Sequence, residues 1–354
     1  MAKQRSGDHD FVGSGPLVSF FEGMVLGNGD LGAIMYGNPF ELRFSLGKND
    51  VWDARFDSNA EADILKHDDL IKLIEEYGVE AFRSGQTGNL GPGQPAWMLN
   101  PVGKKAIPLD VRTVYATPAF YENGRYCRPC PKRVGEIVFV GPGLSTTPMD
   151  SRLSIEEGVV SIEFRYRDDA VIRLEGFVWA ESNIFCLRVE VKGNLDWGGW
   201  AKLIMRKWPD AVDASIPDPV LKAPLERLVT LTQEIPGDDA VDPFAWTLAG
   251  VAPGGRLDQR YESIISLPKA DAVADHFFAV ATTRDSHDSK RAIELAIHAH
   301  TQGYDLLLES QKEWWASFWE RSSVELEDKE LESAWYRDLY LLACTLKEGK
   351  QAPG

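Results

Sequence analysis

Apolar and polar side chains alternate along much of the first two-thirds of the chain. Val160, Ile162, Phe164 and Tyr166 are separated by polar residues, which is the period of two that a half-buried strand shows. Comparable runs, bracketed by glycine, proline, asparagine or aspartate, occur at 31–36, 42–46, 171–177, 185–191, 228–232, 244–251, 261–267 and 277–282. Many short strands without regular intervening helices predict antiparallel sheets. We therefore expect a mainly β fold, with a large antiparallel β-sandwich (a super-sandwich) over 11–284.

Outside these strands, the sequence predicts three further segments. Residues 1–10 contain no apolar run, and we expect them to be disordered. Apolar residues spaced for one helix face predict a helix around 70–77, and a Gly- and Pro-rich stretch predicts a long loop over 84–103.

The period changes to helical from Asp285 onward. A helix capped by Asp285 or Ser286 is predicted to run to about 300, with a face formed by Ile293, Ala296, Ile297 and His300. A second helix is predicted over about 305–321. Its aromatic residues have helical spacing, which is typical of packing between elements: Trp314, Trp315, Phe318 and Trp319.

A third helix is predicted over 328–347, after Asp328 as its N-cap. Large apolar residues form one stripe along it, at Leu331, Trp335, Leu339, Leu342 and Leu346. Because so amphipathic a helix needs a covering partner, we expect either neighbouring helices or self-association through this face.

The composition of the chain argues against some classes of binding partner. The 354 residues contain 38 Lys+Arg and 54 Asp+Glu, a net charge of −16, which argues against nucleic-acid and anionic-membrane partners. The N-terminus has no signal-peptide pattern, and no apolar stretch is long enough to span a bilayer. These features predict a soluble acidic protein, with the cytoplasm as the default compartment.

Cys127 and Cys130 form a Cys-Arg-Pro-Cys motif. One interpretation is a redox dithiol, but no amphipathic helix follows to lower a thiol pKa. A zinc site would need two further soft ligands, and we expect neither a metal nor another cofactor. The alternative is a turn punctuated by prolines.

The densest polar and aromatic residues lie at 27–32 and 48–53. The side-chain amide and carboxylate groups of these segments can hydrogen-bond to pairs of sugar hydroxyls, and the Trp52 ring offers a flat face on which a sugar can pack. The structural alternatives are a hairpin turn at 27–32 and a capped turn at 48–53 with Trp52 in the core. The candidate sugar-binding residues are Asn28, Asp30, Asn49, Asp50, Trp52 and Asp53.

No catalytic set emerges from the residues themselves. The chain has neither a Gly-x-Ser-x-Gly nor a His-Glu-x-x-His motif. His298 and His300 are two apart on a predicted helix, so they point to different sides and cannot share a metal ion. Spacing alone does not select a catalytic pair among 54 acidic residues.

These motifs resemble the N-terminal domain of glycoside hydrolase family 95-like enzymes, which include α-L-fucosidases and relatives acting on other α-linked sugars. The resemblance rests first on Gly-Asn-Gly-Asp-Leu-Gly at 27–32, within 22–37, and on Leu-Gly-Lys-Asn-Asp-Val-Trp-Asp at 46–53. It rests also on Trp-Trp-x-x-Phe-Trp-x-Arg-Ser at 314–322, on 335–343, and on Gly-Lys-x-x-Pro-Gly at 349–354. Segment 48–53 differs from the fucosidase pattern, more often Asn-Glu followed by Trp, so the sugar stays open.

The resemblance implies a β-sandwich, a helical linker over 285–327 and an (α/α)6 barrel that begins with the helix at 328–347. The catalytic carboxyls of such enzymes lie in the barrel, so the resemblance places none of them within these 354 residues. An inverting pair would stand roughly 6.5–9.5 Å apart. The expected function is therefore that of the N-terminal portion of a glycoside hydrolase acting on an α-linked oligo- or polysaccharide. A non-catalytic carbohydrate-binding module and a thiol oxidoreductase are the alternatives.

Overall fold

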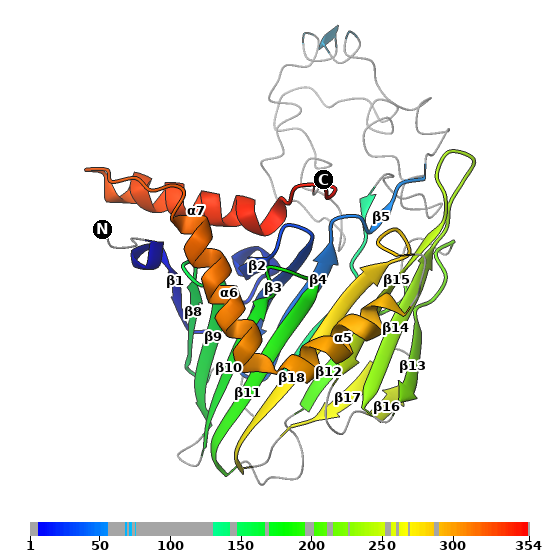
Figure 1. Ribbon diagram of the computed structural model, residues 1–354, viewed down its shortest axis with the longest axis horizontal. Coiled ribbons are helices and arrows are strands. Elements are labelled where there is room, and N and C mark those ends of the chain that lie inside the picture. The colour runs from blue at the N-terminus through cyan, green and yellow to red at the C-terminus, as the bar shows by residue number, and fades with distance from the viewer. Residues whose placement is uncertain are drawn as a thin grey trace.

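Two large antiparallel sheets packed face to face form most of the molecule (Figure 1). The computed structural model describes residues 6–55, 68, 71, 72, 75, 130–141, 147–166, 170–194, 202–210, 215–225, 227–251, 256–259, 262–267, 270–286 and 290–352. The predicted fold class, a mainly β sandwich followed by helices, is confirmed.

The larger sheet has nine strands, and each pairs antiparallel with its neighbours. In spatial order they are β1 (Phe11–Ser14), β8 (Met149–Ser154), β9 (Val159–Tyr166), β10 (Ala170–Val178), β11 (Ile184–Asn194), β18 (Ala270–Thr282), β15 (Phe244–Val251), β14 (Leu228–Ile235) and β13 (Val220–Leu225).

The smaller sheet has seven strands. In spatial order they are β16 (Arg256–Gln259), β17 (Glu262–Ser266), β12 (Lys202–Arg206), β7 (Gly135–Val140), β4 (Glu41–Lys48), β3 (Leu31–Asn38) and β2 (Met24–Gly27). A short ribbon of β5 (Trp52–Asp53) and β6 (Cys130–Pro131) lies beyond β4.

The main core lies between the two sheets. Along β3, Leu31, Ala33 and Met35 are fully buried, while the residues between them face outward and are half-buried. The period of two seen in the sequence therefore separates an inner face from an outer face in each sheet.

Three helices follow the last strand: α5 (Arg291–Gln302), α6 (Tyr304–Trp319) and α7 (Lys329–Thr345). Figure 1 shows α5 and α6 lying across the outer face of the nine-stranded sheet. A second apolar cluster forms there between these helices and outward-facing residues such as Phe177 and Phe277. The prediction that the aromatic residues of the second helix pack between elements is confirmed for Trp315 and Trp319, which are buried against the sandwich.

The start of α5 differs from the prediction. Neither Asp285 nor Ser286 caps the helix, which has Lys290 at its N-cap position without a side-chain hydrogen bond. The Asp285 carboxylate instead accepts from the Thr282 N–H and from Lys48. The face of α5 that packs on the sheet consists of alanines, and Ile297, expected on this face, is exposed.

Helix α7 confirms its predicted N-cap, because the Asp328 carboxylate accepts from the N–H groups of Glu330 and Leu331. Its buried face is formed by Glu332, Tyr336, Tyr340 and Cys344. The predicted apolar stripe lies beside this face. Trp335 and Leu339 are half-buried against the core, whereas Leu331, Leu342 and Leu346 are 59%, 52% and 49% exposed. Self-association through this stripe stays a prediction.

The N-terminal residues depart from the expected disorder. Ser6–His9 form a short 3-10 helix in which His9 is buried and stacks on Tyr336 at 4.5 Å between ring centroids. Arg337 of α7 donates to the carbonyl oxygens of His9 and Asp10, and these hydrogen bonds hold the N-terminal segment against the helix. The reason is long-range: no local pattern reveals a partner more than 300 positions away.

Some predictions fall outside the described residues. They are the helix carried by Leu70, Leu73, Ile74 and Tyr77, the loop at 84–103, and Cys127. The boundaries at 284/285 and 327/328, and the barrel that the last helix would begin, stay predictions.

We expect His276 on β18 to make stability depend on pH. Its side chain is fully buried, and neither ring nitrogen has a hydrogen-bond partner within the described part of the chain. Burial lowers the pKa of His276 from 6.5 to about 4. The folded state therefore favours the neutral ring of His276. The contribution of this preference to the free energy of unfolding is fully present above pH 6.5 and decreases by about 3 kcal/mol as the pH falls toward 4.

Urea titrations of the wild type and His276→Leu between pH 7.5 and 4 test this. The variant should lose stability less steeply below pH 6.5, whereas His298→Gln, at an exposed position on α5, should follow the wild type. Parallel pH curves for the wild type and His276→Leu would contradict this account of the histidine.

Candidate functional site

The two polar segments singled out in the sequence lie side by side. Strands β3 and β4 form an antiparallel hairpin in which Leu31 pairs with Lys48, so the residues before β3 and after β4 meet at one end of the sheet. The Asn49 N–H donates to the Asp30 carbonyl at 2.9 Å and continues this pairing. The sandwich thus brings Asn28, Asp30, Asn49 and Asp50 together.

Asn28 holds the turn between β2 and β3. Its Oδ1 accepts from the N–H groups of Asp30 and Leu31 at 3.1 and 2.9 Å, which is an Asx turn. Its Nδ2 donates at 2.9 Å to the carbonyls of Trp179 and Ser182 in the turn between β10 and β11. Asn28 is 4% exposed, so its amide joins the two sheets at this end rather than facing solvent.

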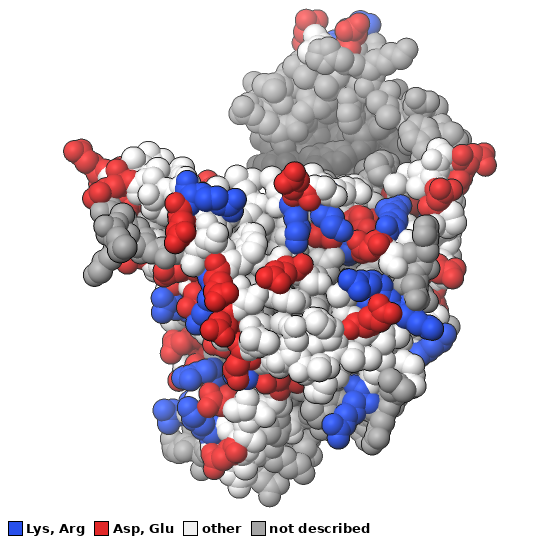
Figure 2. Space-filling view, viewed as in Figure 1, with Lys and Arg blue, Asp and Glu red and all other residues white. Residues whose placement is uncertain are grey.

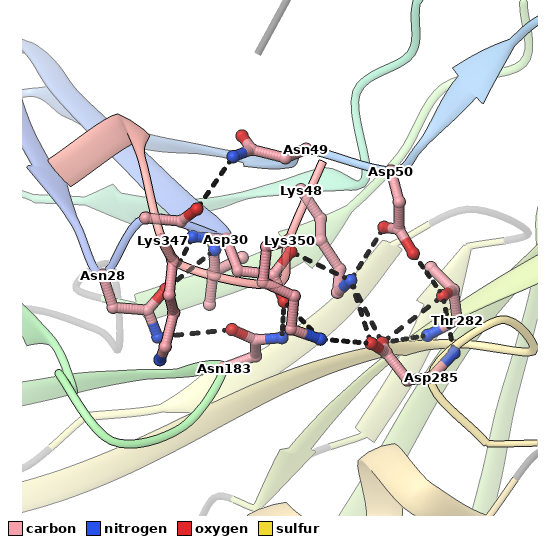
Figure 3. Close-up of polar contacts among 12 residues, drawn as sticks. Asn28, Asp30, Lys48, Asn49, Asp50, Asn183, Thr282, Asp285, Lys347 and Lys350 are labelled. Carbon is pink, nitrogen blue, oxygen red and sulfur yellow. Dashed lines mark hydrogen bonds and ion pairs between the residues drawn. The ribbon is translucent and has the colours of Figure 1, made fainter. Parts of the chain in front are cut away.

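The centre of this region is an ion cluster around Lys48, whose side chain is 1% exposed (Figure 3). Its Nζ lies 2.7 Å from Asp50 Oδ1, 3.2 Å from Asp30 Oδ1 and 3.1 Å from Asp285 Oδ2. Lys350 reaches Asp30 and Asp285 from the segment after α7, at 3.3 and 3.0 Å. The ion cluster is defined as Asp30, Lys48, Asp50, Asp285 and Lys350.

The cluster favours the charged forms of Lys48 and Asp285. Burial lowers the pKa of Lys48, but the surrounding carboxylates, Asp50 first, raise it more, so its pKa lies above the ordinary value. Burial raises the pKa of Asp285, but Lys48, the Thr282 N–H and Lys350 together lower it by more. The pKa of Asp285 therefore lies below its ordinary value. Lys48 and Asp285 are therefore ionised at neutral pH.

The glycines of 27–32 let the end of α7 approach the sandwich. A Cβ at Gly27 would overlap the Cys344 carbonyl oxygen, and one at Gly29, with φ of +83°, would overlap that of Leu346. The Gly29 N–H donates to the Cys344 carbonyl, and Asn49 Nδ2 donates to the Thr345 carbonyl, both at 2.9 Å. These donors satisfy carbonyls that the last turn of a helix leaves without partners.

Trp52 and Asp53 occupy different environments, although they are neighbours on β5. Asp53 is fully buried, and its two carboxylate oxygens each accept from Arg55 at 2.8 Å. Trp52 is half-buried and faces a pocket on the outer side of the seven-stranded sheet. Asn49 lines the same pocket, whereas Asn28, Asp30, Asp50 and Asp53 do not.

This outer-face pocket has a volume of about 520 Å³. Gly32 and Gly47 pair with each other on β3 and β4 and form part of its floor, where the absence of side chains hollows the sheet. Its walls include aromatic and polar groups that the sequence did not single out: Phe20, Lys132 and Arg133. The Arg133 guanidinium lies over the Phe20 ring, 5.5 Å from its centroid, and Lys132 bonds Asp210 at 2.9 Å.

The pocket residues could not be found from spacing. Phe20 and Arg133 are more than 100 positions apart, and only the pairing of β4 with β7 brings them together. One local signal was present: a capping box formed by Ser19 and Glu22 fixes the short helix Phe20–Glu22.

Neither a metal-binding cluster nor a membrane-spanning helix occurs in the described part of the chain. Within those ranges, no three side chains of the metal-ligating types come together to hold an ion. None of the helices described is both long and apolar enough to span a bilayer. Cys130 lies on β6 opposite Asp53, while its motif partner Cys127 lies outside the described residues.

Comparison with known proteins gives likenesses among solved structures alone. No family model matches the chain, and no curated protein matches its sequence. Among solved structures it is similar to a family GH92 α-mannosidase from Bacteroides thetaiotaomicron, with 10% identity and a TM-score of 0.28 over 55% of this chain and 26% of that chain. The same enzyme in complex with mannoimidazole matches equally. The neighbour is a glycoside hydrolase of a different family from the one that the motifs resemble, and a likeness this low does not assign an activity.

We expect Lys48→Met to destabilise the protein strongly, because it leaves the carboxylates of Asp30, Asp50 and Asp285 buried with less positive charge. Removing one partner from a buried ion group costs about 3–5 kcal/mol. Lys312→Met is the matched control: Lys312 forms a solvent-exposed pair with Glu157, and its loss should cost no more than about 1 kcal/mol. Urea unfolding measures both; equal, small losses would show that the ion cluster does not hold this region together.

Proposed function

We propose that this chain is the sandwich portion of a glycoside hydrolase and that its outer-face pocket binds part of an α-linked saccharide. The observation that carries the proposal is the combination of Trp52 and Phe20 rings with Asn49 and Arg133 around one pocket of about 520 Å³. Rings pack against the C–H faces of a sugar, while amide and guanidinium groups hydrogen-bond its hydroxyls. The size is within the range of about 300–1,000 Å³ of typical small-molecule sites.

The sequence resemblance supports the same class from a different direction. The motif at 27–32 and the Lys350 segment, which carry the resemblance, meet in the ion cluster. Together they fix the direction of the chain after α7, the segment that the resemblance expects to run toward an active site. In this proposal the sandwich positions that segment and binds sugar, and the catalytic carboxyls belong to the barrel of the parent enzyme.

A non-catalytic carbohydrate-binding module is the second candidate. It is favoured by one observation: Phe20, Asn49, Trp52 and Arg133 all belong to the sandwich segment, so the groups proposed to contact sugar are present without a catalytic barrel. Hydrolysis separates the candidates only when the parent enzyme is tested, because both predict that the 354-residue chain releases no product from aryl α-glycosides. A turnover abolished by one Asp or Glu substitution within this chain would contradict both candidates.

We expect the chain to bind α-linked oligosaccharides and Trp52→Ala to weaken that binding about tenfold, equivalent to about 1.4 kcal/mol, because the stacking face is lost. Titration calorimetry with a panel of α-linked manno-, gluco- and fuco-oligosaccharides measures it. Trp208→Ala is the control, since this tryptophan is 48% exposed and lies outside the pocket. Binding that survives Trp52→Ala unchanged, or no binding to any member of the panel, would contradict the proposed site.

A further inference from the structure

A second, smaller pocket lies on the other side of the ion cluster from the outer-face pocket. Its volume is about 230 Å³. The turn between β10 and β11 contributes Ser182 and Asn183, α5 contributes Arg291, and the segment after α7 contributes Lys347 and Lys350. It is smaller than the roughly 300–1,000 Å³ of sites for drug-sized ligands, so its occupant would be no larger than about a monosaccharide.

The carboxylates on its wall already have partners. Asp30 Oδ1 accepts from Lys48, and its Oδ2 accepts from Asn183 Nδ2 at 2.7 Å and pairs with Lys350. Asp285 is bonded by Lys48, Lys350 and Thr282. These acids are therefore neutralised inside the protein and have little capacity left for a cationic ligand.

Lys347 is in the opposite situation. Its side chain is half-buried, and its Nζ donates one hydrogen bond, to the Ala180 carbonyl at 3.1 Å. Within the described chain it forms no ion pair with a carboxylate. Burial lowers the pKa of Lys347; Asp30 and Glu181 raise it, and Lys350 lowers it, with a net pKa below the ordinary value. An ammonium with unused donors and no paired carboxylate thus faces the pocket.

Two other charged groups face the pocket. Arg291 is exposed, and its nearest carboxylate, Glu294, is 3.6 Å away. Glu181 is exposed and accepts from Ser310 Oγ at 3.2 Å. The described residues that line the pocket thus include three acidic and three basic side chains. Lys350 pairs with Asp30 and Asp285, and Arg291 with Glu294, so Lys347 is the basic group of this lining that has no carboxylate partner within the described chain. Figure 2 shows basic and acidic side chains gathered near the end of the chain, at the upper edge of the face that α5 and α6 cover.

We propose that this pocket binds a small oxyanion, a carboxylate or phosphate group on a ligand no larger than a monosaccharide, with Lys347 as its main donor. Arg291 and the Ser182 hydroxyl would complete its contacts. The site is distinct from the outer-face pocket, and it does not depend on the chain acting on saccharides. The Lys347 ammonium would donate charge-assisted hydrogen bonds to the oxyanion. The oxyanion would then be the anionic partner that Lys347 lacks within the described chain.

Titration of the 354-residue chain with glucuronate, glucose and inorganic phosphate at low ionic strength tests the proposal. Glucuronate or phosphate should bind, and glucose should not. Lys347→Gln should weaken binding about tenfold or more, because a charge-assisted hydrogen bond is lost. Glu181→Gln should tighten it, since a carboxylate that lines the pocket and would repel an oxyanion is removed. Lys312→Gln, an exposed change on α6, should leave it unchanged.

The opposite responses of two variants keep the test independent of folding, because a damaged fold cannot bind more tightly. Tighter binding of glucuronate than of phosphate would identify a sugar acid as the ligand, and the reverse would identify a free or sugar-borne phosphate. The proposal is overturned if neither anion binds, if glucose binds as well as glucuronate, or if Lys347→Gln and Lys312→Gln bind alike. Loss of oligosaccharide binding in Trp52→Ala with oxyanion binding intact would separate this site from the proposed function.

Discussion

The burial of the Lys48 ammonium among three carboxylates is the constraint on which the arrangement of this end of the molecule depends. The ion cluster connects the β3–β4 hairpin, the residues after β18 and the segment after α7. Burying ions costs several kcal/mol each before their mutual attraction is counted, so such a cluster is weak evidence for high stability. Its consequence is geometric: only one placement of the chain after α7 pairs Lys350 with Asp30 and Asp285.

The same constraint determines what the polar motifs can do. Glycines at 27 and 29 serve the close approach of α7, and Asn28 holds its own turn. Asp53 is held by Arg55. Among the residues chosen as sugar ligands, Asn49 and Trp52 thus line the outer-face pocket, while the others make internal contacts. In this motif, most of the carboxylate and amide groups therefore hold the surrounding backbone and side chains in place, and few of them line the pocket.

The sequence was most informative where the structural signal is local. Alternation of apolar residues located strands such as β9, β11 and β15, and the Asp328 N-cap located the start of α7, whereas β2, β7 and β12 were not predicted. It was misleading for the faces of the helices. On α5 the expected face included Ile297, which is exposed. On α7 the stripe was expected to need a partner, and three of its residues are indeed exposed, but the sequence did not reveal that Tyr336, Tyr340 and Cys344 contact the sandwich, with the Tyr340 hydroxyl donating to the Val25 carbonyl.

The functional regions depend on pairings that spacing does not contain. Asp285 was expected to cap α5, and only the approach of β4 to the end of β18 shows that it binds Lys48 instead. Phe20, Arg133 and Lys347 join their pockets through strand pairing and the path of the chain after α7. The face of α7 that contacts the sandwich is likewise determined by tertiary contacts and not by the amphipathic pattern of the helix.

The central claim is that one end of the sandwich combines a sugar-binding outer face with an internal ion cluster whose carboxylates, Asp30, Asp50 and Asp285, do not line the outer-face pocket. Hydrogen exchange of the backbone amides, measured with and without a saturating α-linked oligosaccharide, tests it most directly. The account predicts new protection at Phe20–Glu22, Trp52–Asp53 and 132–133, where the chain lines or borders the outer-face pocket, and none at 181–183. Protection confined to 28–30 and 181–183, or spread over the far edge of the nine-stranded sheet, would contradict it.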